Sequence, residues 1–370
     1  MHIRLIDEKK GSGLPLSMVL WSLRGGDNMY VNIRMEKPLG WYPGPFVIGL
    51  ASIASDVGCD VDWFERIMSE QPHVDRHERL VSMAFVQSLC DKVGQLRPII
   101  LSEGTQRQAG QQSASLVGLS LGEPTLKAVL TRTAAMTLLN TNLFTYRFES
   151  LPARKAYSIS LLPIIPIPWW LHLCFTHQFS VGLASRAAFS DIEIEEVVLG
   201  GARVAQRSDL SALTDAVLST TIVSDSAPSR VIYKAKSLDQ ANRFANKPWR
   251  NMTNSLVNPL ISSRLKAQPW TYRCYMMILK HFDAGLSLSM EAISNSLGAD
   301  VSTLRRYLQV EETGFKPLVT LFRNQQAQLM MIDGVSIEQM AERLDFKSVV
   351  SVKRLCRAGL IGREAIPAFK

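Results

Sequence analysis

Two adjacent arginines near the end of the chain lie among small polar side chains. Arg305 and Arg306 follow Asp300 and precede Gln309. An arginine can donate two hydrogen bonds to one guanine, a glutamine can pair with adenine, and a hydroxyl suits a phosphate or a base edge. The candidate DNA-contacting residues in this run are Ser302, Thr303, Arg305, Arg306 and Gln309. Within the set, Arg305 is the predicted base contact, whereas Arg306 is expected at a phosphate or at a structural acid.

A second basic and polar run lies close to the end of the chain. Its candidate contact residues are Lys347, Ser348, Ser351, Lys353, Arg354 and Arg357. The alternative for any single charge in either run is that it only solvates the face of a helix.

Each run follows a short apolar segment that is typical of a scaffold helix. A small residue precedes a leucine by three positions in both segments, as Ser294 before Leu297 and as Ala341 before Leu344. The small residue lets two helices approach closely, and a tight turn then leads into the second helix. The pattern predicts two helix-turn-helix units, in which the second helix of each unit carries the basic run.

Capping signals set the expected helix boundaries. Asp300 is a strong N-cap candidate and starts a helix at Val301. Ser336 and Gln339 have the spacing of a capping box. Between the two units, a helix is expected from about Phe315 to Ile332 with an apolar stripe. At 1.5 Å per residue it is roughly 25 Å long, which can place two recognition helices in successive major grooves.

These features resemble the AraC/XylS family of bacterial transcription activators over the last 80-odd residues. The resemblance rests on Leu304-Arg305-Arg306-Tyr307-Leu308, Phe315, Arg323, Ala327, Ile337, Ala341, Leu344 and Phe346. It implies an all-α C-terminal domain over 284–370, promoter DNA and RNA polymerase as partners, and no cofactor. The second unit departs from the family at Asp345, where glycine is usual, and at Val352 and Cys356, where aromatics are usual. We therefore expect its DNA contacts to be weaker or less sequence-specific, mainly to phosphates.

Composition is that of a soluble globular protein with several domains. The chain has 370 residues, 46% of them hydrophobic, and a net charge of +8. Between Arg230 and His281 ten Lys or Arg stand against one acid, Asp239. This basic approach either aids phosphate contact or is a solvated linker face. Five scattered cysteines without ligand spacing indicate the cytoplasm, without a disulfide framework or a structural zinc site.

The part before the double unit is predicted to be an α+β domain. Alternating apolar residues indicate strands around Phe144–Phe148, Ile192–Val198 and Arg230–Lys234. Helices are expected from about Asp75 to Leu89 and from Glu123-Pro124 to about Leu139. The expected organisation is an arm over 1–44, an effector-binding or dimerisation domain over 45–262, and a basic helical linker over 263–283.

This N-terminal part is similar to the arabinose-binding-type domain of AraC-like regulators. The similarity rests on Gly118–Leu126, Ala227-Pro228, Tyr233, Phe244-Ala245 and Asn258-Pro259-Leu260. It implies a homodimer and control by an effector rather than catalysis.

A charge-free segment over Ala156–Ser185 raises the question of a membrane span or of a ligand pocket. Its length permits a span, but Pro163, Pro166 and Pro168 forbid one continuous helix. A buried strand that ends at the prolines, followed by a helix from about Trp169, is the preferred interpretation. The alternatives are a membrane-tethered regulator and a pocket lining for a hydrophobic effector such as a fatty acid.

A rival catalytic motif is Gly118-Leu119-Ser120-Leu121-Gly122, which matches the nucleophile elbow of serine hydrolases. That motif needs a hydrophobic strand before it, and here a polar stretch precedes it. We therefore expect no enzyme activity. His73 and His77 are spaced i, i+4 but lack a metal motif, so no metal site is expected.

Overall fold

The computed structural model describes residues 122–359, except 140, 166, 168–170, 173–174, 177, 183–191, 201–220, 224–226, 267 and 347. Before residue 122 it describes 41–43, 55, 62 and 80–82. There, β1 (Trp41–Pro43) pairs antiparallel with β2 (Leu80–Ser82). The helix expected from Asp75 to Leu89 is therefore wrong at Leu80–Ser82. The end of the expected arm over 1–44 thus pairs with a strand of the domain expected over 45–262.

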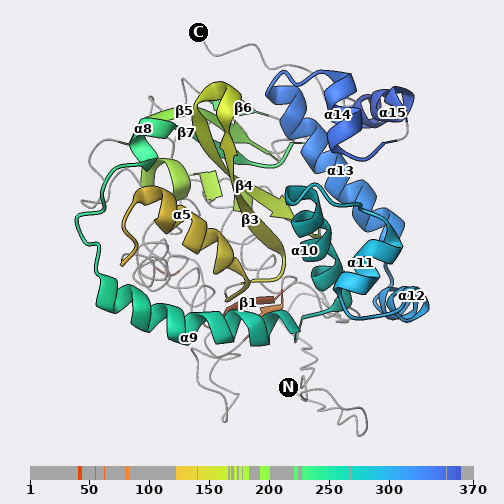
Figure 1. Ribbon diagram of the computed structural model, residues 1–370, viewed down its shortest axis with the longest axis horizontal. Helices are drawn as coiled ribbons and strands as arrows, with labels where there is room; N and C mark the ends of the chain where they lie inside the picture. Colours follow the sequence, from red (N-terminus) through yellow and green to blue (C-terminus); the bar gives the residue numbers. More distant parts are fainter. Residues whose placement is uncertain are drawn as a thin grey trace, which may run out of the picture.

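A five-stranded sheet forms the centre of the first half (Figure 1). Its strands, in spatial order, are β3 (Phe144–Leu151), β4 (Ala156–Pro163), β7 (Arg230–Lys234), β5 (Ile194–Leu199) and β6 (Thr221–Val223). All neighbours are antiparallel except β5 and β6, which are parallel. The three strands predicted from the sequence are confirmed as β3, β5 and β7.

The charge-free segment supplies β4, which lies between β3 and β7. As predicted, the strand ends at Pro163. Trp169, where a helix was expected to begin, lies outside the described residues; helical residues follow at 171–172 and 175–176, and Gln178–Gly182 is a π-helix. Most of the segment's described apolar side chains are buried, among them Ile159, Leu161, Leu162, Ile164, Leu171, Phe175 and Phe179. Ile165 and Ile167 are half-buried. The buried ones fill the core, as the preferred interpretation required. No described helix is long and apolar enough to cross a membrane.

Three helices accompany the sheet: α5 (Leu126–Ala135), α8 (Ala235–Leu238) and α9 (Lys247–Lys266). The α5 helix begins slightly later than Glu123-Pro124, because Thr125 is its N-cap and accepts from the Ala128 amide at 3.2 Å. Together with the sheet, these helices are called the sheet region below.

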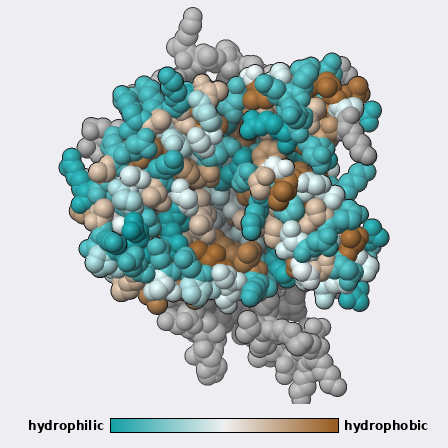
Figure 2. Space-filling model, viewed as in Figure 1, coloured by the Kyte–Doolittle hydropathy of each residue, from teal (hydrophilic) through white to brown (hydrophobic). Residues whose placement is uncertain are grey.

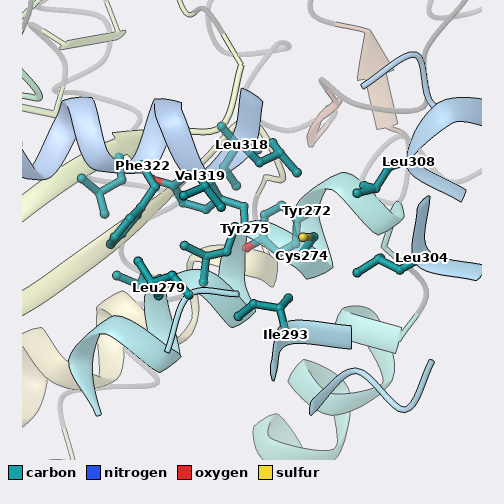
Figure 3. Close-up of a cluster of buried hydrophobic side chains, with 14 of the residues drawn as sticks. Tyr272, Cys274, Tyr275, Leu279, Ile293, Leu304, Leu308, Leu318, Val319 and Phe322 are labelled. Carbon is teal, nitrogen blue, oxygen red and sulfur yellow. The ribbon is translucent and has the colours of Figure 1, made fainter. Parts of the chain in front are cut away.

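Six helices follow: α10 (Trp270–Asp283), α11 (Met290–Ser296), α12 (Val301–Val310), α13 (Phe315–Ile332), α14 (Ile337–Arg343) and α15 (Val349–Gly359). They form the C-terminal helical region, so an α+β half precedes an all-helical half. Most of the expected linker is α10, and it is helical as predicted. Tyr272 and Tyr275 of α10 are fully buried against α11–α13 (Figure 3). Ile278 of α10 is fully buried in the same cluster.

The apolar core continues from one region into the other. Leu138, Leu162 and Ile164 of the sheet region belong to the same buried cluster as Leu304 and Phe322 of the helical region. The second unit has a smaller cluster of its own, whose buried members are Ala327, Met330, Met340, Ala341, Leu344 and Val352. The two clusters are joined through α13.

Candidate nucleic-acid interface

The two helix-turn-helix units repeat one another in hydrogen-bond detail. Each scaffold helix begins at a serine N-cap, Ser289 for α11 and Ser336 for α14. The predicted capping box at Ser336 and Gln339 is present. In each unit the small residue, Ser294 or Ala341, is buried, as the close helix approach requires.

Both turns use a left-handed residue to stop the scaffold helix. Gly298 has φ of +69° and Asp345 has φ of +55°. In both units the next amide returns to the carbonyl of the small residue: Ala299 to Ser294 at 3.0 Å, and Phe346 to Ala341 at 2.9 Å. This is the Schellman arrangement, for which glycine is preferred but in which aspartate is tolerated. Asp345 therefore fills the place of the usual glycine without changing the turn.

The exposed face of α12 carries four of the five predicted contact residues. Leu304 and Leu308 are fully buried, which turns Ser302, Arg305, Arg306 and Gln309 to solvent. These four have the spacing i, i+3, i+4, i+7, so they share one face of the helix. Thr303 lies outside this row and is half-buried.

Asp300 is confirmed as the N-cap, and it engages both neighbouring hydroxyls. It accepts from the Thr303 amide at 2.8 Å, from the Ser302 hydroxyl at 2.6 Å and from the Thr303 hydroxyl at 2.8 Å. The hydrogen bond from Ser302, followed by those from Thr303, holds the pKa of the Asp300 carboxyl well below its usual range. Both hydroxyl protons are therefore used within the protein, and only the oxygen lone pairs of Ser302 and Thr303 remain for a ligand.

Contacts with α10 hold the recognition helix in place. The Tyr307 ring stacks on Trp270 with centroids 4.6 Å apart, and the Arg306 guanidinium lies 5.5 Å from the Tyr307 ring. Glu311, just past the end of α12, accepts from the Trp270 and Thr271 amides at 2.7 and 2.8 Å. One carboxylate thus caps α10 and fixes the end of α12.

The second recognition helix repeats this pattern. Val352 is fully buried like Leu304, and Ser351, Lys353 and Arg354 are exposed. Ser348, before the helix, accepts weakly from the Ser351 amide at 3.4 Å. Lys347 and the side chain of Arg357 lie outside the described residues.

Aligning the helix starts, Val301 with Val349, puts Arg305 opposite Lys353 and Arg306 opposite Arg354. On the same basis Ser302 corresponds to Val350, which is 64% exposed. Val350 was not predicted as a contact residue, because only polar side chains were expected to bind bases or phosphates. It adds an exposed apolar side chain to the face that carries Lys353 and Arg354.

Both recognition helices lie at the outer side of the helical region, away from the sheet, with α13 between them (Figure 1). Figure 2 shows a largely hydrophilic surface there, with small hydrophobic areas. The predicted bounds of α13, Phe315–Ile332, are confirmed.

The basic approach over Arg230–His281 is not a uniform phosphate-binding surface. Arg230 is fully buried and forms an ion pair with Asp333 at 2.7 Å. Lys234 and Lys236 both pair with Glu193. The expectation of phosphate contact is therefore wrong for Arg230, whose cation is neutralised inside the protein.

The rival sites find no support among the described residues. Ser120 of the hydrolase motif lies outside them. His172 is buried and its Nδ1 lies 2.9 Å from the Ser229 hydroxyl, while burial lowers the His172 pKa to about 4. Ser229 also accepts from the Gly200 amide at 2.9 Å, so this pair is part of the core. In the described part of the chain, no three His, Cys, Asp or Glu side chains are grouped to hold a metal ion.

Comparison with known proteins yields one structural similarity. No protein-family model matches the sequence, and no curated protein matches it. The crystal structure of the transcriptional regulator CdpR from Pseudomonas aeruginosa is similar, with 15% sequence identity and a TM-score of 0.36. The similarity covers 81% of this chain and 95% of that chain. At this level it establishes neither the fold nor the function of this chain.

Proposed function

We propose that this protein is a sequence-specific DNA-binding transcription regulator of the AraC/XylS type. The observation that carries the proposal is the doubled unit. Two helix-turn-helix units with serine-capped scaffold helices and the same turn hydrogen bond present corresponding basic side chains, Arg305 with Lys353 and Arg306 with Arg354. A pair of such units joined by one helix suits two adjacent major grooves of a duplex.

We propose that α12 and α15 contact different parts of the DNA. On α12, the exposed row combines arginine and glutamine, which can read guanine and adenine edges. On α15, Lys353 and Arg354 are proposed to bind phosphates, and Val350 to meet a thymine methyl. Hydrogen bonds to Asp300 make Ser302 and Thr303 acceptors, and this favours cytosine or adenine amino groups over phosphate oxygens as their partners.

The wider proposal takes its remaining parts from the family resemblance. These are a bacterial promoter as the target, RNA polymerase as a partner, a homodimer, a hydrophobic small-molecule effector and a cytoplasmic location. Most of the described apolar side chains of Ala156–Ser185 lie in the core and offer no open surface to such an effector.

Selection from a random duplex pool, followed by fluorescence anisotropy at several salt concentrations, tests the proposal. We expect enrichment of one motif and an affinity that falls steeply with salt. Arg305→Ala should relax the preference at one base position, costing about 1–3 kcal/mol of discrimination against the wrong base. Lys353→Ala should weaken binding evenly across sequences and lower the salt slope by about one.

Lys236→Ala is the matched control, because Lys236 is exposed on α8, in the sheet region, and pairs with Glu193. It removes the same charge away from both recognition helices and should leave affinity and salt slope unchanged. An Arg305 variant with unchanged base preference would refute the role of Arg305. Absence of an enriched motif would refute sequence-specific binding.

A further inference from the structure

The junction between the two helix-turn-helix units is held by the sheet region through one carboxylate. Asp333 is the C-cap of α13, three residues before the N-cap of α14. Arg230 of β7 donates to both of its oxygens, from Nη1 to Oδ2 at 2.8 Å and from Nη2 to Oδ1 at 2.7 Å. A two-bond arginine–carboxylate pair fixes orientation as well as distance.

A second arginine completes this cluster, which we call the Asp333 clamp. Arg154, just after β3, donates to Asp333 Oδ1 at 3.3 Å, to Glu195 at 2.7 Å and to Glu196 at 3.1 Å. Glu196 also lies 3.7 Å from Arg230. Glu195 and Glu196 of β5 thus hold the two arginines within the sheet region. Asp333 binds to arginines that the sheet region has already positioned.

Further contacts between the regions lie at the end of α10 and within α13. Arg147 of β3 donates to Asp283 at the end of α10 at 2.7 Å and to Gln326 of α13 at 2.6 Å. Gln325 of α13 donates to the Pro163 carbonyl at 2.7 Å. With the shared apolar cluster, these bonds seat α10 and most of α13 on the sheet.

The second unit depends more on its junction. Among the described residues, the cluster of the second unit contains no side chain of the sheet region, whereas the cluster of the first unit extends to Leu138, Leu162 and Ile164. The direction in which the chain leaves α13 decides where α14 and α15 lie, and Asp333 stands at that exit.

We propose that the Asp333 clamp positions the second recognition helix, so that the sheet region sets the placement of α15 relative to α12. This inference rests on the proposed function, because it assigns a role in DNA binding. Asp333, Arg230 and Arg154 act as positioning residues that do not touch DNA. Any change at β5 or β7 that moves Glu196 or Arg230 would then reach the second unit without altering the first.

Hydrogen exchange of the full chain tests the clamp without DNA. Asp333→Asn should speed amide exchange in Ile337–Arg343 and Val349–Gly359 more than in Val301–Val310. Asp283→Asn is the matched control, since it removes the same charge from the same interface beside the first unit. It should leave exchange in α14 and α15 at the wild-type rate. Arg230→Lys keeps the charge but loses the paired geometry, and serves if Asp333→Asn does not fold.

Affinity for two duplexes tests the role in binding. One duplex carries both half-sites selected by the wild type, and the other has the second half-site scrambled. We expect Asp333→Asn to lose about tenfold or more on the complete site and to match the wild type on the scrambled one. Equal losses on both duplexes, or unchanged exchange in α14 and α15, would overturn the proposal. A wild type that binds neither duplex refutes the proposed function, and the exchange data alone then decide whether Asp333 holds the second unit.

Discussion

Substituting Asp333 and substituting Arg230 should lower the free energy of unfolding by different amounts. Asp333→Asn leaves a guanidinium that is 0% exposed and whose Nε has no hydrogen-bond partner in the described structure. Removing one partner of a buried ion pair costs about 3–5 kcal/mol. Glu196 remains 3.7 Å from Arg230 and an asparagine oxygen still accepts one bond, so we expect the lower end, about 3 kcal/mol.

Arg230→Met should lower the free energy of unfolding less, because the remaining Asp333 carboxylate still has solvent and a hydrogen-bond donor. The Asp333 side chain is 15% exposed and keeps the hydrogen bond from Arg154. The loss is then closer to that of one charged hydrogen bond, about 1.5–3 kcal/mol, partly offset by the apolar methionine. The double variant should be more stable than Asp333→Asn alone, because it carries no unpaired buried cation.

Urea unfolding followed by far-ultraviolet circular dichroism measures these differences as shifts in the midpoint. The pair joins two regions, so the single variants are also expected to broaden or split the transition. A control at Lys236, 69% exposed, should leave the midpoint unchanged when changed to Gln. The reasoning fails if Asp333→Asn and Arg230→Met cost the same and their effects add, since additivity would mean that the two side chains do not interact.

Further predictions concern the helix-turn-helix units and the core. Gly298→Ala should lose about 1–2 kcal/mol in urea unfolding, because φ is +69° and no atom within 4 Å would oppose the added methyl, so only the backbone pays the cost. Asp345→Gly should be tolerated or slightly stabilising by the same measurement. Leu304→Ala should cost about 3 kcal/mol, whereas Val310→Ala, at a site 77% exposed, should change stability by less than about 0.5 kcal/mol. The pKa of His172 is lowered to about 4, so the unfolded chain binds its proton more tightly. Stability from this group is complete above about pH 6.5 and falls by up to about 3 kcal/mol as the pH drops towards 4; His172→Gln should flatten that part of a stability–pH curve.

Local signals in the sequence predicted local structure well. The cap at Asp300, the capping box at Ser336 and the bounds of α13 are all confirmed. Each depends on residues within one or two turns of the chain, where spacing and side-chain chemistry decide the outcome. The strand Arg230–Lys234 was found for the same reason, from its short apolar run.

Long-range polar contacts were not predictable in this way. Arg230 and Asp333 are 103 positions apart, and nothing in the sequence near either one indicates the other. Arg230 counted as one of ten surface cations, yet it is the largest fully buried side chain in the described structure. The same holds in α13 for Gln325 and Gln326, which follow Arg323 and Asn324 in a polar run of the sequence. Both are buried against the sheet region and bonded to it.

The turn of the second unit departs from the family pattern but meets the physical requirements of the turn. Asp345 departs from the usual glycine, and this suggested a degenerate unit with weaker contacts. The turn requires only a residue that accepts a positive φ and an amide that returns to the Ala341 carbonyl, and both are present. Arg323 of α13 adds a hydrogen bond to the Asp345 carbonyl at 2.8 Å and stacks over Phe346, which holds the turn from outside. The two units therefore share the scaffold cap and the turn hydrogen bond, and the second has one more residue between that turn and its second helix. If the protein binds DNA as proposed, we expect any difference between the units to come from this extra residue, from the side chains of α15 and from the Asp333 clamp.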